Sequence, residues 1–250
     1  MSVLNTVKKT SKKRPRRTLL YGVHGIGKSS WACQWPSPVF INLEDGLTDL
    51  DADAFPVART LQEAWQPIIE LGTPSDHGFK TLVIDSADWL ERVIWDSVAH
   101  KNSVRSISEI GFGKGYAQAA DIFSKILASL DMVRDSGMHV LLLAHSSIKK
   151  HESPDSESYD RYTPKLHQNA AGVGASSLVQ EWADEVLFCN YKTYVSSTDR
   201  GFGKREVRAT GAGERVIYTS ERPSHLAKSR LNLPDTVPMS LDSFDYGQYL

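Results

Sequence analysis

Eight consecutive residues near the amino end have the types and the spacing of a phosphate-binding loop. Gly22, Val23, His24, Gly25, Ile26, Gly27, Lys28 and Ser29 fit the pattern G-x-x-x-x-G-K-[ST], with every fixed position filled. The glycines allow positive φ and close backbone approach, so several N–H groups can converge on phosphate oxygens. Lys28 would reach the β- and γ-phosphates and Ser29 would ligate Mg²⁺, with Ser30 as the next residue of the same site. The pattern predicts a binding site for a nucleoside triphosphate, expected to be ATP, with Mg²⁺.

Two acidic residues that end apolar segments are candidates for the remaining chemistry. Asp85 ends the apolar run 80–85 and has the form of the aspartate that holds Mg²⁺ through water. Glu44 ends the run 38–44 and is therefore expected at the carboxyl end of a strand. Open parallel sheets bind ligands at the carboxyl ends of their strands. Glu44 could position the water that attacks the γ-phosphate, or it could simply start a turn. Ser86 stands directly after Asp85, where many ATPases have a catalytic glutamate, and this favours Glu44 as the catalytic acid.

A histidine ends the next apolar run. His145 follows the leucine-rich segment 139–144 and is expected to point toward the γ-phosphate beside Asp85. Two interpretations remain open: a sensor of nucleotide state, or a histidine with no role beyond its own hydrogen bonds. Asp88, three residues after Asp85, is a weaker candidate for the catalytic acid than Glu44, and the favoured interpretation is a residue that stabilises the start of a helix.

The elements that must position these residues alternate between strand and helix. Strands are expected at 18–21, 38–44, 80–85, 139–146 and 185–190, and helices at 28–34, 61–71, 87–100, 116–135 and 176–184. Further strands at 191–197, 205–210 and 215–219 are expected to extend the sheet. The alternation predicts an α/β fold with a mostly parallel sheet, helices on both of its faces and antiparallel strands added near the carboxyl end.

Two polar segments and a basic arm are candidates for binding a partner. Residues 103–115 and 147–172 are expected to be loops, and basic residues interleaved with tyrosines in the second suit single-stranded DNA, although its acids weaken that interpretation. Residues 8–17 hold seven cations and no acid, which suits either a solubilising tail or a non-specific contact with phosphates.

The chain is expected to divide into a basic arm at 1–17, an ATPase domain at 18–234 and an acidic, aromatic tail at 235–250.

The composition limits the number of domains, the cellular compartment and any association with a membrane. The chain has 250 residues, a net charge of −1 and two cysteines, which suits one α/β domain in a reducing compartment. No apolar run approaches the length of a membrane-spanning helix, and the basic arm lacks the apolar segment of a signal peptide. We expect no membrane partner and a cytoplasmic location, in the host cell if the protein belongs to a phage.

With these elements in line, the sequence resembles the RecA-like P-loop ATPase core, particularly its short phage-encoded versions of the AAA-type nucleotide-binding and single-strand annealing kind. The resemblance covers about residues 18–234, with residues 22–29 matching the Walker A element and residues 82–86 resembling the Walker B strand. It implies that Glu44 is the catalytic glutamate and that His145 stands where the family has a glutamine that couples ATP to DNA.

The same resemblance implies partners. The segments 103–115 and 147–172 fall where the family's two DNA-binding loops lie. Lys228 and Arg230 resemble cations that reach the γ-phosphate on an adjacent subunit, which implies a homo-oligomer, either a ring or a filament. A single-strand-binding protein is a further candidate partner. We expect no counterpart of the larger recombinases' separate DNA-binding domains within these residues.

Three functions remain open at this point. The favoured one is a phage ATPase that binds single-stranded DNA and promotes annealing or homologous recombination. The alternatives are a hexameric helicase-like or packaging motor, and a nucleotide-gated scaffold that recruits replication proteins. A small-molecule kinase is disfavoured because no arginine-rich lid segment follows the run that ends at Asp85.

Overall fold

The structure of the protein is a computed structural model that describes residues 7, 14–73, 75–153, 156–199, 205–210 and 213–243. Most of the expected basic arm and residues 244–250 of the expected tail lie outside these described residues. No helix in the described part of the chain has both the length and the apolar character needed to cross a bilayer.

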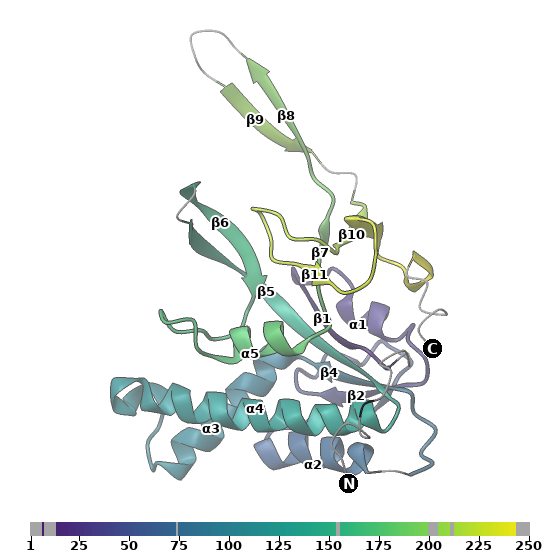
Figure 1. The fold of residues 1–250 in the computed structure, drawn as a ribbon, viewed down its shortest axis with the longest axis vertical. Coiled ribbons are helices and arrows are strands. Elements are labelled where there is room, and N and C mark those ends of the chain that lie inside the picture. The colour runs from purple at the N-terminus through teal and green to yellow at the C-terminus, as the bar shows by residue number, and fades with distance from the viewer. Residues whose placement is uncertain are drawn as a thin grey trace.

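A ten-stranded sheet forms the centre of the molecule (Figure 1). Its main path runs β12-β10-β7-β1-β5-β4-β2-β3. The parallel strands are β1 (Arg17–Gly22), β2 (Pro38–Asn42), β3 (Asp53–Ala54), β4 (Thr81–Asp85), β5 (His139–Ser153) and β7 (Glu185–Tyr191). Three short strands add antiparallel pairings: β10 (Arg215–Tyr218) and β11 (Lys228–Ser229) pair with β7, and β12 (Thr236–Pro238) pairs with β10. The predicted α/β fold, with its mostly parallel sheet and added antiparallel strands, is confirmed.

Helices cover both faces of the sheet. One apolar cluster joins the sheet to α2 (Leu61–Gly72), α3 (Ala87–Lys101), α4 (Lys114–Asp135) and α5 (Ala175–Trp182). The other cluster joins the opposite face to α1 (Lys28–Ala32) and its neighbour Trp35. Successive residues of β1 alternate between the clusters, with Leu19 in the first and Leu20 in the second. Strands buried on both faces need continuous apolar runs, which is why these strands are recognisable in the sequence.

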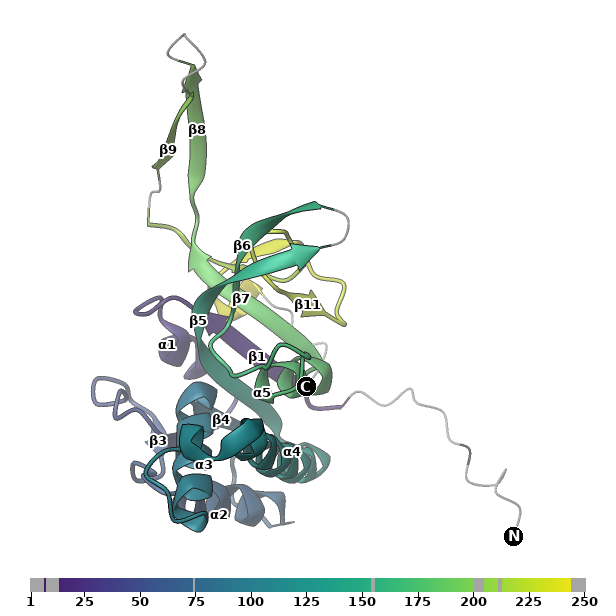
Figure 2. The same ribbon diagram turned by 90° about the vertical axis from the view of Figure 1, so that its left-hand side faces the viewer.

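The segment 147–172 is not the structureless loop that its polarity predicts. β5 continues to Ser153 and pairs antiparallel with β6 (Ser156–Pro164), and the two strands rise from the sheet as a hairpin (Figure 2). Lys150 lies opposite Asp160, and an opposite-charge pair across two strands favours the hairpin. Polar residues on both faces of an exposed hairpin give no apolar alternation, so composition alone indicates a loop.

The segment 103–115 also has more structure than predicted. It contains two short 3₁₀ turns, Ile107–Glu109 and Gly111–Gly113, and α4 begins directly afterwards at Lys114. The turns place a fully exposed phenylalanine, Phe112, in the left-handed region at φ 57°.

The strands expected at 191–197 and 205–210 do not extend the main sheet. β8 (Tyr194–Asp199) and β9 (Arg205–Thr210) pair only with each other within the described residues, and Figures 1 and 2 show this hairpin standing away from the sheet. Both edges of β7 are already occupied, by β1 on one side and by β10 and β11 on the other. Of the three strands expected after Tyr191, only the last, β10, joins the main sheet.

Candidate nucleotide-binding site

The predicted phosphate-binding loop connects the end of β1 to the start of α1. Gly25 and Gly27 lie at φ 70° and 100°, where a side chain would be strained. Gly22 is required for a different reason, because a Cβ there would lie 2.2 Å from the carbonyl oxygen of Cys189 on β7. The strand, loop and helix therefore follow in the order that the motif needs, and each of these glycines has a steric reason.

The side chains that follow the loop lie where the motif requires them. Lys28 is 8% exposed, and its Nζ donates to the carbonyl oxygens of Val23 at 3.2 Å and Gly22 at 3.4 Å. Ser29 Oγ donates to Asp85 Oδ2 at 2.6 Å. Mg²⁺ takes oxygen ligands, so this hydroxyl and carboxylate together form a donor set that fits the ion.

Asp85 is at the end of β4, two strands away from β1 in the sheet. Burial raises the pKa of its carboxyl, while the Ser29 hydrogen bond and the charge of Lys28 act to lower it. A buried carboxylate beside one lysine has a strong electrostatic preference for a further cation, which agrees with a role in holding Mg²⁺.

A pocket of about 370 Å³ joins the loop to the strand ends. It is lined by Gly25, Gly27, Lys28, Ser29, Ser30, Glu44, Gly46, Asp49, Leu50, Asp85 and His145. Of the predicted phosphate-binding residues, Gly25, Gly27, Lys28, Ser29 and Ser30 line this pocket, together with both candidate acids and the candidate sensor histidine, whereas Gly22, Val23, His24 and Ile26 do not line it. A pocket of this volume falls within the usual range for small-molecule sites.

Besides lining the pocket, Glu44 belongs to a compact cluster of polar side chains. Its Oε1 accepts a hydrogen bond from Ser86 Oγ and lies 3.6 Å from His145 Nδ1. Burial raises the pKa of Glu44, although the Ser86 hydrogen bond and the nearby His145 act in the opposite direction. A carboxylate with a raised pKa accepts protons more readily, which suits a residue that positions or activates water.

Asp88, which the sequence indicated only as a weaker candidate, belongs to the same cluster. Its carboxylate accepts from the backbone N–H of His145 at 3.1 Å, and its Oδ2 lies 3.0 Å from His145 Nδ1. Although burial acts to raise the pKa of Asp88, its hydrogen bonds with His145 and Ser86 hold it below the usual value. The available signal was its place in the first turn of α3, three residues after Asp85.

Arg215 is a residue that the sequence did not indicate. It begins β10, and its Nη1 donates to the carbonyl oxygen of Ile26 at 3.3 Å. The guanidinium lies so close to the loop that a Cβ on Gly27 would be 2.7 Å from Nη1. Only the antiparallel pairing of β10 with β7 brings this exposed cation to the phosphate-binding loop.

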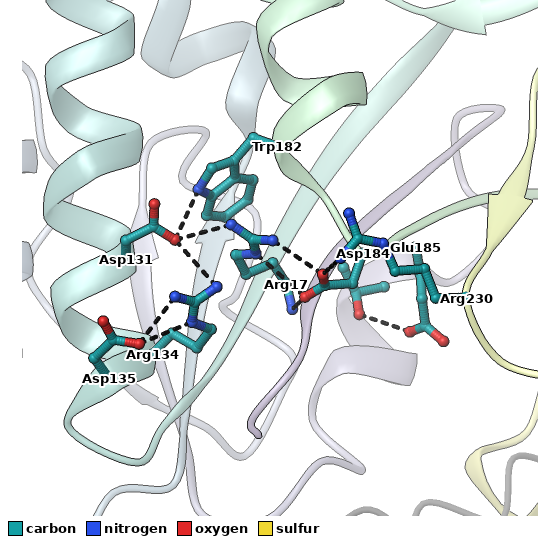
Figure 3. A network of polar contacts seen from close by, with 9 residues as sticks. Arg17, Asp131, Arg134, Asp135, Trp182, Asp184, Glu185 and Arg230 are labelled. Carbon is teal, nitrogen blue, oxygen red and sulfur yellow. Dashed lines mark hydrogen bonds and ion pairs between the residues drawn. The ribbon is translucent and has the colours of Figure 1, made fainter. Parts of the chain in front are cut away.

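Lys228 and Arg230 lie away from the pocket of their own chain. β11 pairs with the amino end of β7, with Lys228 opposite Val186, whereas the phosphate-binding loop follows the carboxyl end of β1. Arg230 Nη1 forms an ion pair with Asp184 Oδ1 at 2.9 Å. Figure 3 shows Arg230 in a network that also contains Arg17 and Asp131. The role of both cations at an adjacent subunit's nucleotide stays a prediction.

The segment that follows β6 is connected to the site by hydrogen bonds. The backbone N–H of Lys165 donates to the carbonyl oxygen of His145 at 2.8 Å. The backbone N–H of His167 lies 3.0 and 3.1 Å from the two carboxylate oxygens of Glu91, one turn beyond Asp88 on α3. The ring of His167 in turn stacks on Tyr116 at 4.4 Å. Backbone hydrogen bonds therefore connect the pocket histidine and α3 to this segment.

Glu91 gives a testable pH dependence of stability. Burial raises the pKa of its carboxyl from 4.5 to about 7. Because the folded-state pKa is the higher one, Glu91 stabilises the fold below about pH 4.5, and this contribution disappears as pH rises through about 7. Between pH 5 and pH 8 we expect the wild type to lose about 2 to 3 kcal/mol more unfolding free energy than Glu91→Gln loses.

Urea unfolding of both proteins at the two pH values measures this difference. Glu109→Gln, which removes an exposed carboxylate, is the matched control and should follow the wild type. Equal pH slopes for the wild type and Glu91→Gln would contradict the assignment.

Comparison with known families agrees with the geometry of the pocket. A family model described as an AAA domain matches residues 14–231, most of the chain. The matched region contains every residue that lines the pocket. A comparison with curated proteins finds no match.

Proposed function

The chain belongs to the AAA domain family, and from that premise we propose that it is an ATPase that binds single-stranded DNA and promotes annealing or homologous recombination, in a phage or prophage. The observation that supports ATP hydrolysis most directly is the shared pocket of the phosphate-binding loop, Asp85 and Glu44. Family membership by itself implies nucleotide binding, and the DNA-dependent function goes beyond it.

In this proposal the residues of the pocket divide the work of hydrolysis. Backbone N–H groups of residues 22–27 and the ammonium of Lys28 hold the phosphates, while Ser29 and Asp85 hold Mg²⁺. The bound ion would offset charge on the phosphate oxygens. Glu44 positions the attacking water, and His145 senses the γ-phosphate from the middle of β5, where its parallel pairing with β1 ends. Hydrolysis in such a site depends on positioning and on electrostatic stabilisation.

Exposed aromatic and basic residues support contact with single-stranded DNA. Phe112 is fully exposed between Gly111 and Gly113, two residues before Lys114. Lys149 and Lys150 lie on the protruding β5–β6 hairpin. Stacking of bases on an aromatic ring, combined with cations along the backbone path, binds single strands with little preference for sequence.

Removing the exposed aromatic ring should weaken DNA binding without affecting the fold. We expect Phe112→Ala to reduce affinity for a single-stranded oligonucleotide by about 10-fold, because one base stacked on an aromatic ring contributes about 1–3 kcal/mol. Fluorescence anisotropy with labelled oligo-dT, in the presence of a non-hydrolysable ATP analogue, measures the change. Met132→Ala on α4, which also removes an exposed apolar side chain, is the control. Equal affinities of the two variants would remove Phe112 from the proposed surface.

Assembly into a homo-oligomer, as a ring or a filament, is part of the proposal. The Arg230 side chain is 60% exposed despite its ion pair with Asp184, so it is accessible to a neighbouring subunit. A cation supplied by a neighbour would make hydrolysis depend on assembly, because transition-state charge in phosphoryl transfer needs such groups. Light scattering with and without ATP and oligo-dT tests assembly. A monomer under every condition would contradict this part of the proposal.

A further inference from the structure

The contact between Asp88 and His145 is more specific than the start of a helix requires. Ser86 is the N-cap residue of α3, and its side chain makes no capping hydrogen bond to the backbone N–H groups of the helix. The Asp88 carboxylate is instead directed at His145, with Oδ1 accepting from the backbone N–H and Oδ2 lying 3.0 Å from Nδ1. Asp88 therefore holds the backbone of β5 and the imidazole ring of His145 together, from a position that is 4% exposed.

The hydrogen-bond partners of Asp88 favour the charged form of its carboxyl group. The hydrogen bonds from His145 and Ser86 outweigh the effect of burial and lower the pKa of Asp88. Ser86 Oγ, 2.9 Å from Asp88 Oδ1, also contacts Glu44. A carboxylate can only accept hydrogen bonds, so His145 Nδ1 must be the protonated partner.

The remaining contacts of the His145 imidazole ring are with His24 and with the pocket. The ring of His24, from the phosphate-binding loop, stacks on His145 with 4.1 Å between ring centroids. His145 lines the pocket beside Glu44 and Lys28. With Nδ1 turned to Asp88, the remaining ring nitrogen, Nε2, is the atom that His145 can offer to a ligand in the pocket.

We propose that Asp88 is the positioning residue of the nucleotide site: it keeps a proton on His145 Nδ1 and so leaves the lone pair of Nε2 free to accept a hydrogen bond from the attacking water, beside Glu44 in the pocket. The inference rests on the proposed function for the role of His145, but the protonation of Nδ1 is a property of the nucleotide-free protein. Asp88 acts through His145 and touches no reacting atom. A carboxylate that orients a histidine fixes both the ring and its tautomer.

Asp88→Asn separates this role from simple packing. The asparagine has the same shape, and its carbonyl oxygen can still accept from the backbone N–H of His145. Its NH₂ group, however, donates to Nδ1 and forces the proton onto Nε2. We expect ¹⁵N spectra of histidine-labelled, nucleotide-free protein to show a protonated Nδ1 at residue 145 in the wild type and an unprotonated Nδ1 in the variant. An unprotonated Nδ1 in the wild type would overturn the proposal, whether or not the variant folds.

Steady-state kinetics then test the consequence. Asp88→Asn should bind ATP within about 3-fold of the wild type while kcat falls by about 10- to 100-fold, as expected for a group needed in the transition state. In a His145→Gln background, where there is no tautomer to fix, adding Asp88→Asn should reduce kcat no further. A full additional loss in that background would show a structural role and overturn the proposal. A wild type that does not hydrolyse ATP would contradict the proposed function, and the ¹⁵N result would still decide the inference.

Discussion

Replacing Lys28 by alanine is expected to weaken ATP binding by about 100-fold and to abolish hydrolysis, because charge-assisted contacts to phosphate contribute up to about 3 kcal/mol. The ammonium group is buried under the loop, where its Nζ is held by the carbonyl oxygens of Gly22 and Val23. No other side chain among the pocket's lining residues is a lysine or an arginine. Isothermal titration with ATP and Mg²⁺ measures affinity, and phosphate release measures turnover.

Lys125→Ala provides the matched control for this prediction. Lys125 is an exposed lysine on α4, outside the pocket lining, and its removal should leave affinity and turnover unchanged. Circular dichroism of both variants checks that the fold is retained. ATP affinity of Lys28→Ala within a few-fold of the wild type would contradict the assignment of the phosphate site.

Replacing Glu44 by glutamine should have a different effect, because it should stop turnover and spare binding. The amide has nearly the same shape and can still accept the hydrogen bond from Ser86 Oγ, but it cannot take a proton from water. We expect kcat to fall by about 10²–10⁴-fold, the usual contribution of a positioned general base, with ATP affinity within about 3-fold of the wild type. Single-turnover hydrolysis and ATP titration measure the two quantities separately.

Asp49→Asn is the control for Glu44→Gln. Asp49 is another carboxylate that lines the same pocket, and it lies outside the cluster of Glu44, Ser86, Asp88 and His145. A general loss of negative charge from the pocket would affect both variants, whereas loss of the base affects only Glu44→Gln. If Glu44→Gln hydrolyses ATP at the wild-type rate, the base lies elsewhere.

The parts of the site that the sequence predicted depend on local pattern. The phosphate-binding loop is a contiguous motif, and the fixed spacing of its glycines, lysine and serine reflects one local geometry. Asp85, Glu44 and His145 each follow an apolar run, and the carboxyl ends of parallel strands meet at one edge of the sheet. For these residues, recognising the strands was enough to place them together.

The parts that the sequence missed depend on pairings between distant elements. Arg215 reaches the loop only because β10 pairs antiparallel with β7, and nothing around residue 215 indicates that partner. Asp88 looks like an acid that favours the start of a helix until its contact with His145, 57 residues later, is known. The β5–β6 hairpin was missed because its residues are mostly polar and have no apolar alternation.

Kinetics also distinguish the proposed function from its alternatives. A helicase-like or packaging motor would share the nucleotide residues but would form closed rings and displace duplex strands. A nucleotide-gated scaffold would bind ATP and turn it over at less than about 10⁻³ s⁻¹ even with DNA, far below typical enzymatic rates. Strand-displacement assays and turnover rates therefore separate the three possibilities.

The most direct test of the central claim is ATP hydrolysis by the purified protein without nucleic acid, with single-stranded DNA and with duplex, each at two salt concentrations. We predict that single-stranded DNA stimulates hydrolysis strongly, that duplex does so weakly, and that the stimulation falls as salt rises because phosphate contacts release counterions. Equal rates in all three conditions would contradict the DNA-coupled ATPase. The 103–115 segment and the β5–β6 hairpin would then have to be interpreted as sites for a protein partner.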